Sequence, residues 1–585
     1  MTEPWEEVTP RGRRLMTRVA IAAVIPLVAL VLPHGADSPG AWTLLPPLLA
    51  IALAFATRST VIPLFGGVWL GATMIAWRDD GGLLSPVKGL VASIDRFIIR
   101  NAVYDPGGSW FSGDGGEWQS FNLSVIGFVF ALVGMVALAI RGGGMAGVAE
   151  RFVVMARSAR ATRITTWLMG LTIFFDDYAN TLIVGGTMRP LTDRMRVSRE
   201  KLAWLVDSTA APVAGLSLLS TWVAYEISQF APQLPPELFP GGENAGYAVF
   251  IETLPYRFYC ILTIFFVGAM SLMGRDYGPM LAAERRARVT GAVFRPGSSP
   301  MSGDDEAAQP VDGIPHRAHV AIIPVASTLL AVVVLFFIDA RAALGASMPT
   351  TLSMESLRVV LGAVENNTLM LFGGSAIGLT VAAAITVGEK LLTPAQALKA
   401  ALSGTRVMFL AVTILVLAWA MSEVCGELGT RDYMTSMAPH IPPLMLPAGL
   451  FILGCLIAFA TGSSWSTMGI LLPIVVGLAA EVGASTSLGA TGMVIVTIGA
   501  VLDGSIFGDH CSPISDTTIL SSTAAGSDHM DHVRTQAPYA LTVCAVALLV
   551  GYLPAAAGVS PWVLLPLGAL ALVGIAQVFG RRLHD

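Results

Sequence analysis

The sequence predicts an all-α polytopic membrane protein with about 12 transmembrane helices, two re-entrant hairpins and an inverted repeat. Three observations predict this fold. The chain of 585 residues is 54% hydrophobic and only 13% charged, whereas soluble domains carry about 25% charged residues. Apolar runs of about 17–25 residues, long enough to span a bilayer, recur along the chain. Glycine, proline and acidic residues interrupt several of these runs, which is typical of secondary transporters.

Charge and cysteine content exclude two other classes of protein. The net charge of −5 provides no basic surface for a nucleic-acid partner. The five cysteines are scattered without paired spacing, so they predict no disulfide framework. The lipid bilayer is therefore the expected environment.

The expected crossings follow from the apolar runs in chain order. The first run lacks a small-residue cleavage site after it, so we expect it to be retained as a helix. The expected spans are 17–33, 41–57, 60–77, 121–140, 200–225, 247–273, 318–340, 360–385, 400–422, 488–522, 537–557 and 561–580.

Two further apolar regions, 162–195 and 446–480, carry a polar tip in the middle. We expect each to be a re-entrant hairpin, which enters and leaves the membrane on the same face. With both hairpins re-entrant and both termini cytoplasmic, most of the 35 Lys and Arg fall on the inner side, as the positive-inside rule requires. A full crossing at 162–195 would place one of its two basic flanks outside.

The two halves of the chain carry related patterns. Gly186 and Pro190 follow the first tip, and Gly469 and Pro473 follow the second with the same spacing. The expected topology places the two tips on opposite faces, which is the inverted-repeat arrangement of secondary transporters. Chance similarity between apolar helices is the alternative explanation. The expected units are N-terminal helices and an outer loop (1–120), a first repeat (121–273), a cytoplasmic linker (274–317), a second repeat (318–536) and C-terminal helices (537–585).

The segment 503–522 concentrates acids within a membrane-length run. Acids are costly inside a bilayer, and we expect Gly504, Gly508 and Pro513 to break the helix and free backbone groups. Such an interrupted, acidic segment predicts an ion or substrate site. A polar loop outside the membrane is the alternative.

A matching interruption is expected at 207–212, within the run 200–225. Oxygen-bearing residues at both tips and at both interruptions are the candidate ligands. Sodium prefers carboxylate, hydroxyl and carbonyl oxygens. A buried carboxylate can hold a proton when the site is empty and release it when Na+ arrives. The candidates are Asp176, Asp177, Asn180, Thr181, Asp207, Ser208, Thr209, Thr461, Ser463, Ser464, Asp509, Ser512, Ser515, Asp516 and Thr517, with Na+ expected at Asp176, Asp177, Asp207, Asp509 and Asp516.

Some of these candidates have plausible structural roles instead. Asp176 and Asp177 are also good N-cap residues for the helix that follows the first tip. His510 is either a pH-sensing group or a hydrogen-bonded structural histidine.

Long motifs resemble those of the NhaC family of Na+/H+ antiporters. They are Phe174–Leu182, Met188–Arg194, Asp207–Pro212, Ala460–Trp465 and Phe507–Thr518. The resemblance implies a prokaryotic plasma-membrane transporter of the ion-transporter superfamily, whose members work as elevators. It further implies that the protein is not an enzyme, needs no cofactor, transports Na+ and H+, and forms a possible homodimer. The loops 78–120 and 275–317 depart from the pattern.

Two other functions are open at this point. Members of the same family also include Na+-coupled exchangers of organic acids, so exchange of an organic anion or amino acid is one alternative. It would require a fixed cation or paired amide donors at the site, and the candidates are Arg406 and the groups of Asn180 and the neighbouring Ser and Thr residues. A metal-dependent membrane enzyme at 509–511 is disfavoured, because adjacent helical residues point in different directions.

Overall fold

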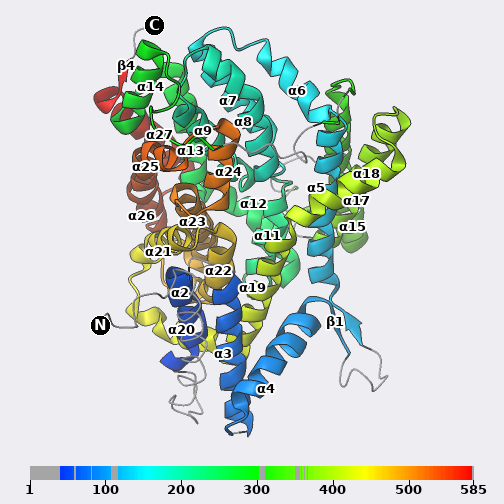
Figure 1. Ribbon diagram of the computed structural model, residues 1–585. Coiled ribbons are helices and arrows are strands. Elements are labelled where there is room, and N and C mark those ends of the chain that lie inside the picture. The colour runs from blue at the N-terminus through cyan, green and yellow to red at the C-terminus, as the bar shows by residue number, and fades with distance from the viewer. Residues whose placement is uncertain are drawn as a thin grey trace, which may run out of the picture.

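The computed structural model describes residues 40–57, 61–80, 82–106, 116–301, 310–311, 313–349, 356, 359–360, 363–364 and 366–582. Apart from four two-residue strands, the regular structure of these residues is helical (Figure 1). The expected span 17–33 lies outside the described residues.

The helices before the first hairpin are η1 (Ala41–Leu44), α2 (Leu45–Thr57), α3 (Val61–Asp80), α4 (Ser85–Ala92), η2 (Ser93–Arg100), α5 (Ser120–Arg141) and α6 (Gly144–Val153). The helices from there to the middle of the chain are α7 (Ala159–Thr172), α8 (Asp177–Arg194), α9 (Arg199–Asp207), α10 (Ala211–Ala214), α11 (Thr221–Phe230), η3 (Ala231–Gln233), η4 (Gly242–Ala245), α12 (Gly246–Thr253), η5 (Leu254–Tyr256), α13 (Phe258–Met273) and α14 (Gly278–Thr290).

The helices of the second half are α15 (His319–Leu344), η7 (Gly345–Ser347), α17 (Asn367–Gly388), α18 (Pro394–Val407), α19 (Phe409–Glu427), α20 (Thr430–Met437), η8 (Ala438–His440), η9 (Pro443–Met445), α21 (Leu446–Thr461), α22 (Ser464–Gly483), α23 (Gly489–Cys511), α24 (Asp516–Ala525), α25 (His529–Val546), η10 (Ala547–Tyr552), α26 (Leu553–Ala556) and α27 (Pro561–Phe579). The strands are β1 (Tyr104–Asp105), which pairs antiparallel with β2 (Glu117–Trp118), and β3 (Arg275–Asp276), which pairs antiparallel with β4 (Arg581–Arg582).

Among the described residues, 10 helices are long and apolar enough to cross a membrane, or up to 11 if a pair bent by 50° near Arg257 counts as one span. α21 together with η9 (Pro443–Thr461), and α22 by itself, pass this test of length and composition, so the second hairpin has two long legs. The first hairpin is shorter, since α7 has 14 residues and α8 has 18.

Five expected spans are bent, divided or shorter in the structure. The run 247–273 bends by 50° near Arg257, and the runs 488–522 and 200–225 carry the interruptions that the sequence predicts. The run 41–57 forms η1 and α2, whose apolar part is shorter than a span. The run 200–225 is divided into three short helices by Pro212 and by the N-cap of α11, where the Ser220 hydroxyl accepts the N–H of Val223. The run 400–422 is divided at Met408, between α18 and α19.

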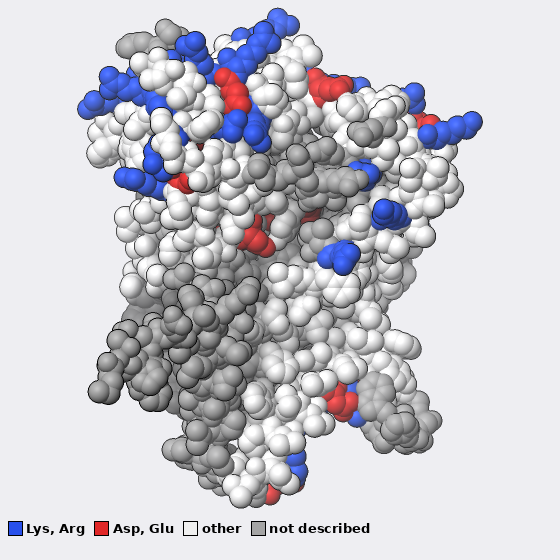
Figure 2. All heavy atoms as spheres, in the orientation of Figure 1, with Lys and Arg blue, Asp and Glu red and all other residues white. Residues whose placement is uncertain are grey.

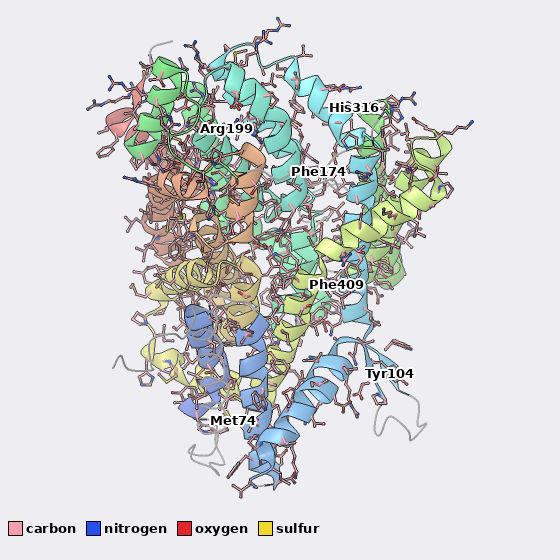
Figure 3. The ribbon with its side chains drawn as sticks, viewed as in Figure 1. Met74, Tyr104, Phe174, Arg199, His316 and Phe409 are labelled. Atoms are coloured by element: carbon pink, nitrogen blue, oxygen red, sulfur yellow. The ribbon has the colours of Figure 1, made fainter. Side chains whose placement is uncertain are left out.

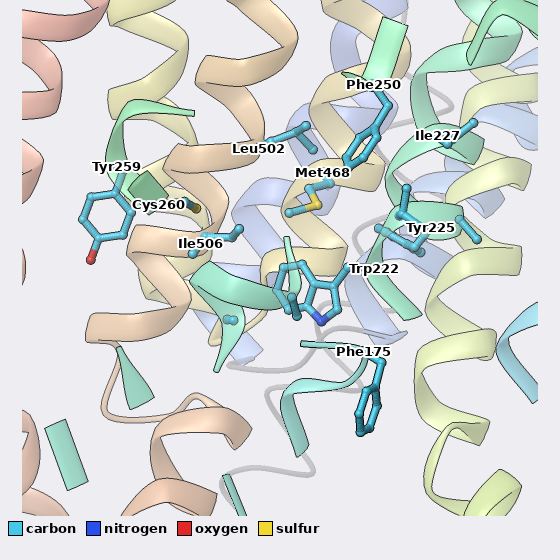
Figure 4. Packing of buried hydrophobic residues seen from close by; sticks show 14 of the residues in the cluster. Phe175, Trp222, Tyr225, Ile227, Phe250, Tyr259, Cys260, Met468, Leu502 and Ile506 are labelled. Atoms are coloured by element: carbon cyan, nitrogen blue, oxygen red, sulfur yellow. The ribbon is translucent and has the colours of Figure 1, made fainter. Parts of the chain in front are cut away.

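The helices form two groups that stand side by side in Figure 1. α15 and α18 each pack against α5, as does α17, which also packs against α15. The other group contains both hairpins and the C-terminal helices, with α23 packed against α21 and α22. Buried side chains such as Trp222, Phe250, Met468 and Leu502 fill this second group (Figure 4).

Gly504 and Gly508 do not break α23, contrary to the sequence-based expectation. The helix continues through both positions to Cys511. A Cβ atom at Gly504 would lie 2.3 Å from the carbonyl oxygen of Phe451, and one at Gly508 would lie 2.5 Å from that of Cys455. The two glycines therefore allow α23 to approach the backbone of α21 directly.

One end of the molecule carries most of the visible Lys and Arg (Figure 2). Arg199 and His316 lie toward this basic end, and Met74 and Tyr104 lie toward the opposite end (Figure 3). Part of the expected linker 274–317 is packed here: Glu284 of α14 is buried between Arg163 and Ser198, and β3 pairs with the C-terminal β4.

Candidate functional site

Each hairpin tip begins its second helix with an N-cap. Asp176 Oδ1 accepts the backbone N–H of Ala179 at 2.8 Å. In the other half, Ser463 Oγ accepts the backbone N–H of Ser466 at 3.3 Å. Asp176 therefore has the N-cap role that the sequence offered as an alternative to ion binding, because its carboxylate satisfies a helix N–H that otherwise lacks a partner.

The two interruptions also form where the sequence suggested. α9 ends at Asp207 and α10 begins at Ala211. α23 ends at Cys511, and α24 begins at Asp516 after the N-cap Ser515. Pro513 lies in this second gap, where a missing N–H costs no helical hydrogen bond.

Both tips and the second interruption meet at a cavity of about 60 Å³. A volume of this size holds a few water molecules, and pockets for organic ligands are about 300–1,000 Å³. The lining residues come from the first tip, α11, α19, the second tip and the second interruption: Asp177, Tyr178, Thr221, Trp222, Met408, Leu410, Ala411, Ile414, Ser463, Ser464, Trp465, Asp509, Asp516 and Thr517.

Only neutral groups hydrogen-bond to the acids of this cavity in the described structure. Asp509 accepts from Ser464 Oγ at 2.9 Å and from Ser515 Oγ at 2.6 Å. Asp516 accepts from the Tyr178 hydroxyl and from the backbone N–H of Thr517. None of the described lining residues is basic. The buried carboxylates of Asp177 and Asp509 and the more exposed carboxylate of Asp516 therefore share a small space without a fixed positive charge.

Other predicted ligands bond within the protein and do not line the cavity. The Asn180 amide donates to the carbonyls of Gly170, Ile173 and Thr209, while its Oδ1 is buried without a hydrogen-bond partner in the described chain. Ser512 donates to Phe459 O at 2.7 Å. Asp176, Thr181, Thr209 and Thr461 are also buried outside the set of residues that line the cavity.

Asp207 belongs to a second polar cluster. Its Oδ2 accepts from Gln536 Nε2 at 2.7 Å and lies 3.8 Å from His532 Nε2. Ser208 Oγ contacts His510 Nε2 at 3.0 Å, and the other ring nitrogen of His510 contacts the Tyr259 hydroxyl at 2.7 Å. His510 is thus a buried, hydrogen-bonded histidine.

Sequence reasoning missed several of these residues. Tyr178 and Gln536 gave no signal beyond their position near predicted ligands. Arg257 did give a signal, because an arginine inside an apolar run requires a buried acid. The structure pairs it with Glu226 and Asp503, so Asp503 is neutralised and is not part of the cavity.

Known proteins resemble this chain over most of its length. A family model described as the Na+/H+ antiporter family matches residues 213–555, which include Asp509 and Asp516. An uncharacterized protein of Haemophilus influenzae is 30% identical over 520 residues, which cover 88% of this chain and 91% of that protein. Two other relatives match over shorter segments. The arginine/ornithine antiporter ArcD of Halobacterium salinarum is 36% identical over 107 residues, or 18% of this chain and 20% of that protein. The Na+/H+ antiporter NhaC of Alkalihalophilus pseudofirmus is 30% identical over 123 residues, or 21% and 24%.

Proposed function

Because the chain belongs to the Na+/H+ antiporter family, we propose that it exchanges Na+ for H+ across a prokaryotic plasma membrane. One observation carries this proposal. Asp177, Asp509 and Asp516 line one small cavity. The other described lining residues have hydroxyl, aromatic or apolar side chains, and none is basic. Such a cavity suits a small hard cation, which prefers oxygen ligands.

The same cavity accounts for competition between the two ions. Two buried carboxylates, those of Asp177 and Asp509, are costly without a cation. Either protons or Na+ can remove this cost, so binding one favours release of the other. The described residues contain no cluster of three or more His, Cys, Asp or Glu arranged to hold a metal. Hydroxyl, carbonyl and water oxygens would therefore complete the coordination of Na+ by Asp509 and its neighbours.

The basic end supports an orientation in the membrane. Lys and Arg gather there (Figure 2), and basic residues favour the cytoplasmic side. We assign the linker 274–317 and the C-terminus to the cytoplasm on this basis. Re-entry of the two hairpins, an elevator-like movement of the group that carries them, and a homodimer complete the proposal.

Exchange of an organic acid or amino acid is the second candidate function. The partial match to an arginine/ornithine antiporter favours it. The cavity does not, because it is small and its described lining lacks a basic residue that would bind a substrate carboxylate. Arg406, the cation considered from the sequence, lies on α18 and does not line the cavity.

Proton flux in reconstituted vesicles tests the proposal. Addition of Na+ to vesicles that contain the protein should drive protons across the membrane, and Asp177→Asn should abolish this flux. Asp79→Asn is the matched control, because Asp79 is half exposed and pairs only with Arg78 among the described residues. Proton flux driven by arginine, ornithine or a dicarboxylate in the absence of Na+ would instead establish the second candidate.

A further inference from the structure

A chain of hydrogen bonds connects Asp207 to a partly exposed histidine at the start of α25. Gln536 Nε2 donates to Asp207 at 2.7 Å, and Gln536 Oε1 contacts His532 Nε2 at 2.8 Å. His532 Nδ1 contacts Ser522 Oγ at 2.9 Å, and Ser522 Oγ contacts His529 Nδ1 at 3.1 Å. Asp207, Ser522 and His532 are buried, whereas His529 is only partly buried.

Counting protons in this chain fixes which ring nitrogens carry hydrogen. Gln536 Nε2 also donates to the carbonyl of His510, so its amide nitrogen faces two acceptors and its Oε1 must accept from His532 Nε2–H. His529 Nε2 contacts the carbonyl oxygen of Pro513 at 2.8 Å. A carbonyl only accepts, so His529 must also carry its proton on Nε2.

Both Nδ1 atoms are consequently bare when the two imidazoles are neutral. Both point at the same Ser522 hydroxyl, which has one hydrogen and also contacts the carbonyl of Thr518 at 2.7 Å. One hydroxyl proton cannot serve three acceptors. The pair His529 and His532 is therefore short of a proton, and one added proton on either Nδ1 turns its contact with Ser522 into a proper hydrogen bond.

One end of this chain of hydrogen bonds lies toward the basic end of the molecule, and its other end lies near the cavity acid Asp509. Arg199, which lies toward the basic end (Figure 3), donates to Gly526 O just before α25. At the other end, Gln536 ties Asp207 to the carbonyl of His510, the residue next to Asp509. Protonation of Asp207 would change this bond and so act on the helix end that carries the cavity acid.

We propose that His529, Ser522 and His532 form a relay that delivers protons from the basic end to Asp207, separately from the cavity that binds Na+. The inference rests on the proposed exchange of Na+ for H+. A proton binds His529 Nδ1 and moves to Ser522 Oγ as the serine passes its own proton to His532 Nδ1. His532 then gives its Nε2 proton to Asp207 Oδ2 as the 3.8 Å gap closes. One proton enters at His529 and one reaches Asp207. His532 is left with its proton on Nδ1, so the next transfer begins once His532 has exchanged this proton for one on Nε2.

The charged and titratable groups around the two imidazoles come from four segments. Asp207 of α9 and His510 of α23 face His532. Asp528 caps α25 and accepts the backbone N–H groups of Met530 and Asp531. Arg295 pairs with Asp531 at 2.8 Å. Asp207 is the one of these groups that the relay can reach through the contacts described above.

Two flux assays on the reconstituted full-length protein test the relay. His532→Gln and Ser522→Ala should slow Na+-driven proton flux at least about 100-fold, the lower end of the range for loss of a proton-transferring group. Exchange of labelled Na+ for unlabelled Na+, which moves no proton, should keep its wild-type rate. His529→Ala should behave like the other two variants and regain proton flux when imidazole is added. His440→Gln, at an exposed histidine outside the relay, is the control and should leave both fluxes unchanged.

The outcomes separate the relay from the underlying function. Equal slowing of both fluxes in His532→Gln would show a structural role and overturn the relay, as would a normal proton flux in that variant. Failure of wild-type protein to move Na+ in either assay would instead refute Na+/H+ exchange itself.

Discussion

Two acids on the same helix, Asp503 and Asp509, meet opposite surroundings. Asp503 accepts from Arg257 Nε at 3.0 Å, from the Tyr259 backbone N–H at 2.5 Å and from the Tyr552 hydroxyl at 2.7 Å. Asp509 has only the hydroxyls of Ser464 and Ser515 as hydrogen-bond donors among the described side chains. Both carboxylates are buried.

Under the proposed function, this difference separates a structural acid from one that binds the transported ions. A fixed guanidinium neutralises Asp503 permanently, so this acid has no need of a mobile ion. Hydroxyl groups stabilise Asp509 by hydrogen bonds but leave its charge uncompensated. An acid of the second kind, beside a cavity, is available to a cation that comes and goes.

Removing the fixed cation should have the largest effect. Arg257→Met leaves Glu226 and Asp503 buried without a positive partner, and it should lower the free energy of unfolding by about 3–5 kcal/mol. The triple variant Arg257→Met, Glu226→Gln, Asp503→Asn removes every charge of the cluster and should recover most of that loss. Unfolding in detergent, followed by circular dichroism, measures both. Equal destabilisation of the single and triple variants would contradict the role assigned to charge.

Neutralising Asp509 should impair transport without loss of stability, whereas neutralising Asp503 should lower stability. Asp509→Asn should slow Na+-driven proton flux at least about 30-fold, the equivalent of about 2 kcal/mol for a lost charged contact. Its melting temperature should stay the same or rise, because an uncompensated buried charge has gone. Asp503→Asn should lower the melting temperature, and its folded fraction should still respond to Na+. A reversal of these two phenotypes would refute the distinction between the acids.

An exposed acid with cationic partners gives the smallest expected effect. Hydrogen bonds from His319 and Arg317, both at 2.6 Å, lower the pKa of Glu389. The associated stability is present above the ordinary glutamate pKa of about 4.3 and is lost as the pH falls through the lowered value. Glu389→Gln should therefore lower the melting temperature at pH 7 by no more than about 2 °C. A difference that persisted in more acidic solution would point to a contribution other than charge.

The sequence was sufficient to locate the two tips and the two interruptions. Pro212, Pro513 and the capping residues Asp176 and Ser463 act through local backbone chemistry, which a single sequence displays directly. The assignment of Asp509 and Asp516 to one polar site depended on the same local signals.

The division of the polar residues among separate clusters could not be read from the sequence. Asp207 meets Gln536 across 329 positions of the chain, and Arg257 meets Asp503 across 246. Such pairings depend on how the helices pack, and many polar residues are compatible partners. Gly504 and Gly508 illustrate the same limit, because a glycine signals a break or a close contact equally well.

The glycine contact between α21 and α23 constrains how the protein can work. The Gly504 and Gly508 positions lie against the carbonyl groups of Phe451 and Cys455, so the backbones of α21 and α23 are in direct contact. In the proposed elevator-like movement, Asp509 on α23 and the Thr461–Ser464 turn at the end of α21 would therefore move together. A Na+ ion bound between these two segments would keep its ligands from both of them throughout the movement. Only its contacts with the opposite side of the cavity would change.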